Sequence, residues 1–178
     1  MSSTWPTPGR CLEDFDGDWN RYIEACYQQY RDDFYSGRPR PWPIGGQDLN
    51  IKRQPVDERG WCRTFWHLVT AGSVEADRLP DLARLERVGW PMEILQAFHE
   101  SYPVRRSAKI CWWMNDRGSG KGRYLLALAD FSYVVIVADR GGYCLLWTAY
   151  PVEYSNRRRR LRQEFEDYWE SVDQQRNG

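Results

Sequence analysis

The strongest constraint on the fold is a series of four short apolar segments between residues 109 and 149. They are separated by polar or glycine-rich connections, of which the longest is residues 115–122. Each segment has the length and the β-branched or aromatic content of a strand. Short connections join antiparallel neighbours, because parallel strands need a long crossover. The series therefore predicts an antiparallel meander with strands at residues 109–114, 123–129, 133–138 and 143–149.

Apolar residues recur at helical spacing in other parts of the chain. In residues 16–34 they form one stripe that includes Ile23, Cys26 and Tyr30. The proline-rich segment 36–43 cannot continue this helix, because proline lacks the backbone donor. The same spacing predicts helices over residues 81–88, 91–100 and 156–172.

An aromatic segment at residues 61–69, WCRTFWHLV, is predicted to be a further strand. Residues 49–53 are predicted to be extended, and residues 70–80 to form a loop. Helices, then strands in series, then a helix is the order of an α+β fold rather than of βαβ units. We expect N- and C-terminal helices and a shorter one between them, packed on a four- to five-stranded, mainly antiparallel sheet.

Length and composition fit a single domain. The chain has 178 residues, and its aromatic content of 15% is too high for a disordered segment. We divide it into an N-terminal helix and proline-rich loop, a sheet core and a C-terminal helix, at residues 1–44, 45–152 and 153–178. No apolar run approaches the ~18 residues of a membrane span, and the start lacks the pattern of a signal peptide. A cytoplasmic protein without membrane partners is expected.

Charge is distributed unevenly, although the net charge is zero. Residues 1–44 hold five Arg and seven acidic residues, and residues 163–178 hold one Arg and five acidic residues, so both ends are acidic. Residues 45–162 hold nineteen Lys and Arg and thirteen acidic residues, a net charge of +6. Polyanion binding depends on local fields rather than on the total charge. The middle segment is therefore the predicted contact region for RNA.

One histidine and two arginines are candidates for chemistry on a phosphate. His67 lies in the aromatic segment, and imidazole is the usual proton shuttle near neutral pH. Arg84 and Arg87 are three residues apart, so they share one face of a helix, and guanidinium groups match phosphate oxygens. The alternatives are structural: His67 bonds to a carbonyl of the sheet, and Asp81 and Glu86 hold the arginines in ion pairs.

The end of the last predicted strand carries two polar side chains on one face. By strand alternation, Thr148 and Tyr150 lie on the side opposite to Trp147 and Ala149. There they are placed to contact a phosphate and to stack against a base. The alternative is an ordinary cross-strand pair.

Four consecutive arginines, Arg157, Arg158, Arg159 and Arg160, begin the last predicted helix. Positive charge at a helix N-terminus opposes the helix dipole, which suggests that this charge has a use along an RNA backbone. The alternative is pairing with Glu164, Glu166 and Asp167.

Metal and cofactor sites are not expected. The acidic residues are dispersed along the chain, and there are only two histidines. A metal-dependent nuclease needs several acidic ligands that converge on the ion. The five cysteines are scattered and include no CxxC pair, so a zinc knuckle or a disulfide framework is not expected either.

Six segments carry a resemblance to a known group of proteins. They are FWH (65–67), RLPDLAR (78–84), ERVGW (86–90), RYLL (123–126), YVV (133–135) and YCLLWTAY (143–150). In order and spacing, over about residues 45–162, they resemble the phage- and toxin-associated branch of the barnase–EndoU–colicin–RelE group of ribonuclease folds.

The resemblance implies helices on an antiparallel sheet and a metal-independent endoribonuclease. Such proteins act as toxins in toxin–antitoxin or phage-conflict systems, and they activate the ribose 2′-hydroxyl to attack the adjacent phosphate. By position, the group's histidine matches His67, its arginines match Arg84 and Arg87, and its polar residues of the last strand match Thr148 and Tyr150. Some members rely on Arg, Lys and Tyr instead, so Lys109 and Arg123 are further candidates.

Two functions follow from these observations. The first is an endoribonuclease whose partners are RNA and a cognate antitoxin or immunity protein. The second is a non-catalytic module that binds RNA or a protein, such as an immunity or antitoxin-like protein. One cleft that contains His67, Arg84, Thr148 and Tyr150 favours the first function. A buried His67 and dispersal of the others favour the second.

Overall fold

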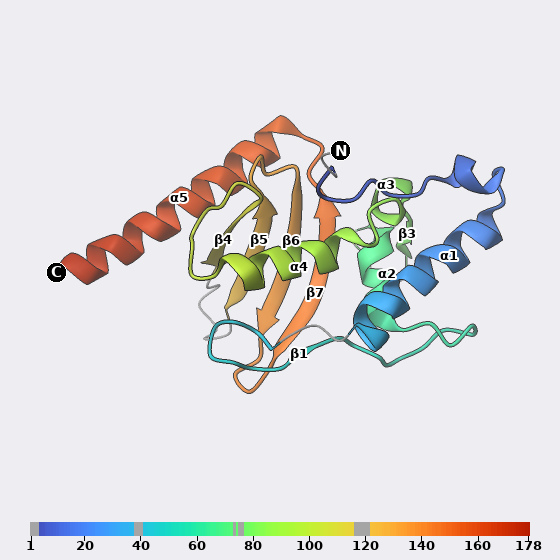
Figure 1. Ribbon diagram of the computed structural model, residues 1–178, viewed down its shortest axis with the longest axis horizontal. Coiled ribbons are helices and arrows are strands. Elements are labelled where there is room, and N and C mark those ends of the chain that lie inside the picture. Colours follow the sequence, from blue (N-terminus) through green and yellow to red (C-terminus); the bar gives the residue numbers. More distant parts are fainter. Residues whose placement is uncertain (1–3, 38–40, 73, 75–76, 116–121) are drawn as a thin grey trace.

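The computed structural model describes residues 4–37, 41–72, 74, 77–115 and 122–178. These residues form the expected α+β fold, with helices on a mainly antiparallel five-stranded sheet of strand order β1-β7-β6-β5-β4 (Figure 1). The helices are α1 (Trp19–Arg31), α2 (Arg63–Val69), α3 (Leu82–Leu85), α4 (Trp90–Ser101) and α5 (Ser155–Asn177). Shorter elements are the helical turns η1 (Leu12–Phe15) and η2 (Asp32–Ser36) and the hairpin strands β2 (Thr70–Ala71) and β3 (Leu79–Pro80).

The predicted meander is confirmed. Its strands are β4 (Ile110–Asn115), β5 (Arg123–Leu128), β6 (Tyr133–Asp139) and β7 (Cys144–Pro151). The turn between β6 and β7 is tight, because the Arg140 amide donates to the Tyr143 carbonyl at 2.9 Å. Gly141 has a φ of +85° there, which glycine adopts without strain. The fifth strand, β1 (Leu49–Asn50), runs parallel to β7 and pairs only with its first two residues.

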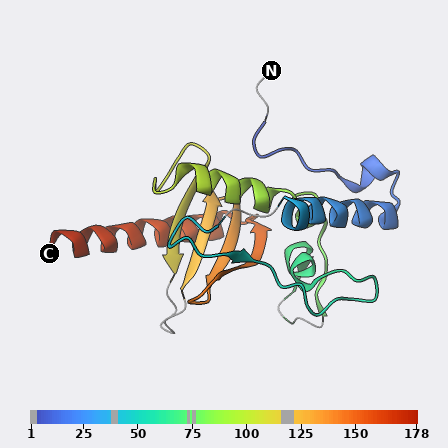
Figure 2. The ribbon, with the colours of Figure 1, turned by 60° about the horizontal axis from the view of Figure 1, so that its bottom comes forward.

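Helices α4 and α5 cover opposite faces of the sheet (Figure 2). Trp112 and Trp113 are consecutive in β4, so their side chains point to opposite faces. The Trp112 ring contacts Phe98 of α4, with ring centroids 5.4 Å apart. The Trp113 ring contacts Phe165 of α5 at 6.0 Å. The larger core lies on the α4 side and includes α1 and α2, and the smaller one lies under α5.

The predicted helices at both ends of the chain are confirmed. Helix α1 begins after Asp18, whose carboxylate accepts the Arg21 amide at 3.1 Å and so satisfies one of the first backbone donors. Its apolar stripe, including Ile23 and Cys26, is buried. Helix α5 is longer than predicted, and its last turns project beyond the sheet (Figure 1).

The prediction of a strand at residues 61–69 is wrong, because most of this segment is helix α2. The buried side chains of segment 61–69 include Trp61, Phe65 and Leu68, which are spaced by three or four residues, as in a helix, and not by two, as in a strand. Arg63 and His67 therefore lie one helical turn apart on the less buried face. Aromatic and β-branched content misled the prediction, because packing against α1 outweighs intrinsic strand preference here.

Strand β7 contains a β-bulge at Trp147. Thr148 pairs with Ile136, but the next pair is Leu146 with Val137, so Trp147 is the extra residue. Tyr150 packs against the core under α5. Residues two apart in a strand face the same side, so Thr148 also faces the α5 side of the sheet. The bulge removes Trp147 from the regular alternation of the strand.

Asp33 is a largely buried acid in η2 at the end of α1. One of its carboxylate oxygens accepts the Gln29 amide at 3.0 Å, and the other is buried without a hydrogen-bond partner among the described residues. Burial raises the pKa of Asp33 to about 7, and the negative charges of Asp32 and Glu93 add to this effect.

The helical assignment of residues 63–69 predicts a large effect at Phe65. Its ring projects from α2, is fully buried and packs against Tyr27 of α1. Phe65→Ala should therefore lower the free energy of unfolding by roughly 3–5 kcal/mol. Urea denaturation measures this change. Glu58→Ala, at a nearby exposed position, is the control and should change it by less than about 0.5 kcal/mol. A small effect at Phe65 would contradict the packing described.

The raised pKa of Asp33 predicts a pH-dependent stability. In the unfolded chain its pKa is about 3.9. Between pH 4 and 7 the folded state therefore holds a proton that the unfolded state has lost, and stability falls as the pH rises through this window. Asp33→Asn stays neutral, so its stability relative to the wild type should increase from pH 4.5 to 7.5 in urea titrations. Glu24→Gln, at an exposed position of α1, is the control, and the same pH dependence in that variant would refute the assignment to Asp33.

Candidate functional site

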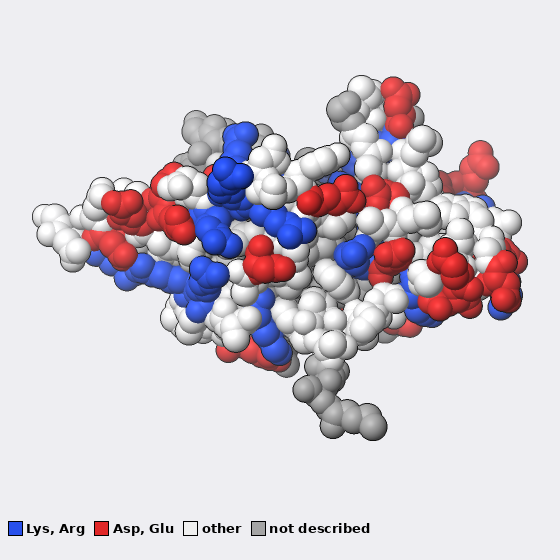
Figure 3. Space-filling view, turned by 90° about the horizontal axis from the view of Figure 1, so that it is seen from above, with Lys and Arg blue, Asp and Glu red and all other residues white. Residues whose placement is uncertain are grey.

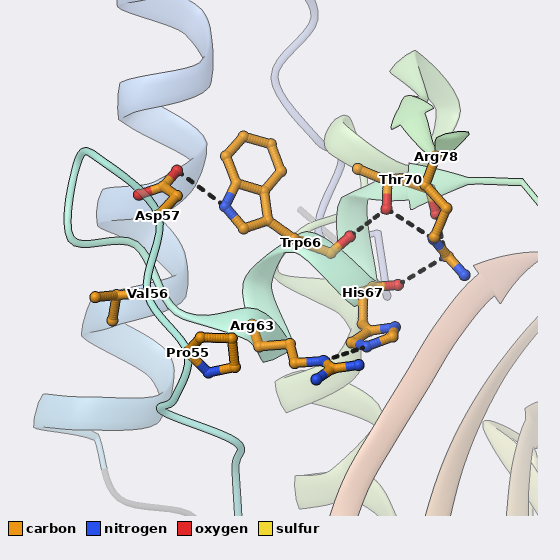
Figure 4. A pocket seen from close by; sticks show the side chains of 8 residues that line it. All are labelled: Pro55, Val56, Asp57, Arg63, Trp66, His67, Thr70 and Arg78. Atoms are coloured by element: carbon orange, nitrogen blue, oxygen red, sulfur yellow. Dashed lines mark hydrogen bonds between the residues drawn. The ribbon is translucent and has the colours of Figure 1, made fainter. Parts of the chain in front are cut away.

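A pocket of about 340 Å³ opens between helix α2 and the loop that precedes it (Figure 4). One wall is fixed by Asp57, whose carboxylate accepts the indole N–H of Trp66 at 3.0 Å and the backbone amide of Trp61 at 2.8 Å. Two arginines give the pocket its positive character, and one histidine lines it. Its lining residues are Pro55, Val56, Asp57, Arg63, Trp66, His67, Thr70 and Arg78.

His67 lies in the last turn of α2 with its half-buried ring at this pocket. The Nε of Arg63, one turn earlier, donates to Nε2 of His67 at 3.3 Å. Because Nε2 accepts in this geometry, the N–H of a neutral ring is at Nδ1. The pair thus places a ring nitrogen lone pair next to a guanidinium, which is a donor set suited to a phosphate ester and its neighbouring hydroxyl.

The carbonyl of His67 anchors the end of α2 to its surroundings. Thr148 of β7 donates its hydroxyl to this oxygen at 3.2 Å, and a guanidinium nitrogen of Arg78 lies 3.5 Å from it. Arg78 also donates to the hydroxyl of Thr70 at 3.0 Å and to the Thr70 carbonyl. These bonds satisfy carbonyls that a helix leaves without partners at its C-terminus. Thr148 and Arg78 therefore position His67.

Arg84 and Tyr150 form a second contact between the helices and β7. The guanidinium of Arg84 donates to the Ala149 carbonyl at 3.4 Å and lies 5.4 Å from the centroid of the Tyr150 ring. Burial lowers the pKa of Arg84, and the positive charge of Arg78 lowers it further. Arg84 is thus a partly desolvated cation close to the strand that carries Thr148.

Trp147 joins the pocket to a group of cations. Its ring is stacked beside His67, with centroids 6.1 Å apart and an interplanar angle of 27°. The Lys52 ammonium lies 4.7 Å from the ring centroid, and the guanidinium carbons of Arg123 and Arg140 lie at 5.3 Å each. We call Trp147, Lys52, Arg123 and Arg140 the Trp147 cluster.

The other predicted RNA-binding residues lie elsewhere. The sheet register places Lys109, just before β4, and the end of β7 at one end of the sheet, and Arg123 at the other. Figure 3 looks onto the end at which α5 begins, where Lys and Arg side chains gather. There Arg157 and Arg160 both contact Glu164, at 3.6 and 3.4 Å, and Arg158 donates to the Val152 carbonyl.

Arg87 is separate from both groups. It donates to the Ala83 carbonyl at 2.7 Å and lies 5.1 Å from the ring centroid of Trp90. Of the predicted catalytic residues, the structure thus brings His67 and Thr148 into contact, and Arg84 and Tyr150 into contact, both along β7. The chemical roles predicted for these residues and for Arg87 stay predictions.

Sequence reasoning missed Arg63 and the cations that join Arg123 at Trp147. Arg63 and His67 have the i, i+4 spacing that brings side chains together on a helix, and the strand interpretation of this segment hid that signal. Lys52 and Arg140 come from the segments after β1 and after β6, and no local pattern connects them.

Comparison with family models, with curated proteins and with solved structures finds no match to this chain, so its function is inferred from the site itself. In the described part of the chain, no helix is long and apolar enough to cross a membrane. Among the same residues, no three His, Cys, Asp or Glu side chains lie close enough together to hold a metal ion.

The positioning role of Thr148 predicts a specific loss of stability. Thr148→Val keeps the side-chain shape but removes the hydroxyl that donates to the His67 carbonyl. The free energy of unfolding should fall by about 0.5–1.5 kcal/mol in urea denaturation. Thr7→Val, at an exposed position, is the control and should have little effect. An unchanged stability of Thr148→Val would show that this hydrogen bond does not anchor α2.

Proposed function

We propose that this protein is a metal-independent endoribonuclease whose reaction takes place in the pocket of His67. The observation that carries the proposal is the Arg63–His67 pair, 3.3 Å apart at the mouth of a cavity of about 340 Å³. An imidazole supplies the proton transfer, and a guanidinium supplies charge for the phosphate. These are two of the groups that RNA cleavage by its own 2′-hydroxyl requires.

The electrostatics of the pocket support a phosphodiester substrate. Arg63 and Arg78 both line the cavity and carry positive charge. Asp57 is the acidic residue of the lining, and its carboxylate already accepts hydrogen bonds from Trp66 and Trp61. The field in the pocket therefore attracts anions.

In the proposed reaction, the 2′-hydroxyl takes the place of Arg63 at Nε2 of His67. The ring accepts the hydroxyl proton while the 2′-oxygen forms a bond to phosphorus and the bond from phosphorus to the 5′-oxygen breaks. The leaving 5′-oxygen takes a proton from water, and the hydroxide so formed takes the proton from the imidazolium. The products are a 2′,3′-cyclic phosphate and a 5′-hydroxyl, without net uptake of water.

Arg63 is well placed for the charged phosphorane. A guanidinium presents its N–H donors as a planar fork, and one of them donates to His67 here. Once the 2′-hydroxyl displaces Arg63 from the ring, this fork matches two phosphate oxygens. Of Arg84 and Arg87, Arg84 is the one that contacts β7 next to Thr148. In this proposal it adds positive potential, and Tyr150 holds it in place.

The biological setting belongs to the same proposal. An endoribonuclease of the group that the sequence resembles acts inside the cell as a toxin in a toxin–antitoxin or phage-conflict system. Such an enzyme needs a cognate antitoxin or immunity protein that blocks its site. An acidic partner surface over the Trp147 cluster and the pocket would supply that block.

A second candidate, a non-catalytic RNA-binding module, has one observation in its favour. Most polar groups around the pocket bond to the protein itself: Arg78 and Thr148 to the His67 carbonyl, and Arg84 to that of Ala149. In such a module, His67 and Arg63 contact RNA but transfer no proton. Cleavage assays separate the two candidates.

The proposal predicts that purified protein cleaves single-stranded RNA in the presence of EDTA. His67→Ala should slow cleavage by roughly 10²–10⁴-fold, because it removes a positioned acid–base group. Arg63→Gln should lower kcat with a smaller change in KM, because its charge acts mainly on the phosphorane. Product ends are identified by mass spectrometry, and circular dichroism checks that each variant is folded.

His99→Ala is the matched control, because His99 is the other histidine and lines a different cavity, next to α4. It should retain wild-type activity. Full activity in a folded His67→Ala variant would remove His67 from the mechanism. Equal cleavage of DNA would exclude the 2′-hydroxyl as the nucleophile. RNA binding without cleavage by the wild type would favour the second candidate.

A further inference from the structure

Three cations of the Trp147 cluster converge on one ring. The charged groups of Lys52, Arg123 and Arg140 lie within 5.3 Å of the Trp147 ring centroid. They come from three segments: the chain after β1, the first residue of β5 and the turn after β6 (Figure 1). The fold thus gathers like charges that are far apart in the sequence.

This convergence has a cost that the ring only partly offsets. Each cation gains about 0.5–1 kcal/mol from the face of a partly exposed indole. The cations also repel one another, because all three lie close to the same ring and salt screens charges at such short range only in part. Among the described residues, no carboxylate forms an ion pair with Lys52 or Arg140. The neighbouring Asp139 instead accepts the Gly141 amide at 2.7 Å.

We infer that the Trp147 cluster is a phosphate subsite, and that it binds a phosphate of a single RNA strand next to the one at His67. This inference rests on the proposed function, because it takes the neighbouring phosphate to be the one that reacts at His67. It also specifies the substrate as an RNA strand longer than a dinucleotide. An anion at the cluster relieves the repulsion among its three cations. The His67 ring, 6.1 Å from Trp147, connects the subsite to the pocket.

The geometry favours one strand over a duplex. The three cations lie around one side chain, Trp147, whereas a duplex presents phosphates along two separate backbones. Trp147 lies at a bulge, and its half-buried ring can also stack against an unpaired base when a cation moves from the ring to the phosphate. Arg63 and the Trp147 cluster then hold consecutive phosphates of the same strand.

The first experiment measures binding without cleavage. A fluorescent single-stranded DNA octanucleotide has phosphates but no 2′-hydroxyl, so anisotropy titrations report binding alone. In Lys52→Gln/Arg140→Gln, the slope of log affinity against log salt concentration should fall by roughly 0.7 for each phosphate that the variant no longer neutralises. Arg21→Gln/Arg31→Gln removes the same charge from exposed positions of α1 and should leave the slope unchanged.

The second experiment measures cleavage. Lys52→Gln/Arg140→Gln should raise KM for an RNA octanucleotide by tenfold or more and leave kcat, and the kinetics of a dinucleotide with one phosphate, unchanged. Trp147→Leu, which removes the ring that gathers the cations, should raise the same KM, and Trp147→Phe should restore most of the loss. A general loss of folding would instead affect both substrates equally.

The two experiments fail independently. If the wild type cleaves no RNA but the double variant lowers the salt slope, the phosphate subsite stands and the nuclease function falls. If the wild type cleaves RNA and the double variant changes neither the slope nor the KM for the octanucleotide, the subsite is overturned and the nuclease function stands. An effect of equal size in Arg21→Gln/Arg31→Gln would also overturn it, because total charge would then suffice.

Discussion

The free edge of β7 is the constraint on which the site depends. Strand β1 pairs only with Cys144 and Leu145, and no other described strand pairs with the rest of that edge. Buried carbonyl groups need donors, and a helix packed beside a strand has free backbone N–H groups only in its first turn. Side chains supply them. Arg84 donates to the Ala149 carbonyl of β7, and Thr148 of β7 donates to the His67 carbonyl of α2. Polar side chains gather at this edge for a structural reason, and the pocket forms where they meet.

The β-bulge at Trp147 links this edge to the basic cluster. In a regular strand, each side chain at this position would enter one of the two cores. The extra residue takes Trp147 out of that alternation, while Leu146 and Ala149 remain in the core under α4. The ring can then contact His67 on one side and receive cations from β5 and from the β6–β7 turn. One inserted residue thus connects the pocket to the cluster without a change in the rest of the sheet.

The sequence predicts what depends on local patterns and fails where tertiary contacts decide. The meander follows from four apolar segments with short connections, and α1, α4 and α5 follow from helical spacing. In residues 61–69 composition favours a strand while burial follows the helical period, so Arg63 stays hidden until the segment is known to be helical. Residue type alone identifies His67, but Lys52 and Arg140 depend on the register of β1, β6 and β7, which brings their segments to one point. Residue chemistry therefore identifies candidates, and topology decides which of them act together.

The chain has two basic regions, which differ in how their cations are held. At the start of α5, Arg157 and Arg160 share the carboxylate of Glu164, and Arg158 is directed to the Val152 carbonyl. Exposed pairs of this kind are weak in energy, but they lower the net charge that a phosphate meets. In the Trp147 cluster, Lys52 and Arg140 meet an aromatic ring, which attracts them through its quadrupole and does not neutralise their charge. The cluster therefore presents positive charge next to His67. In the proposed function, an RNA strand held at the cluster has its adjacent phosphate at the pocket, and the α5 arginines would contact a more distant part of that strand.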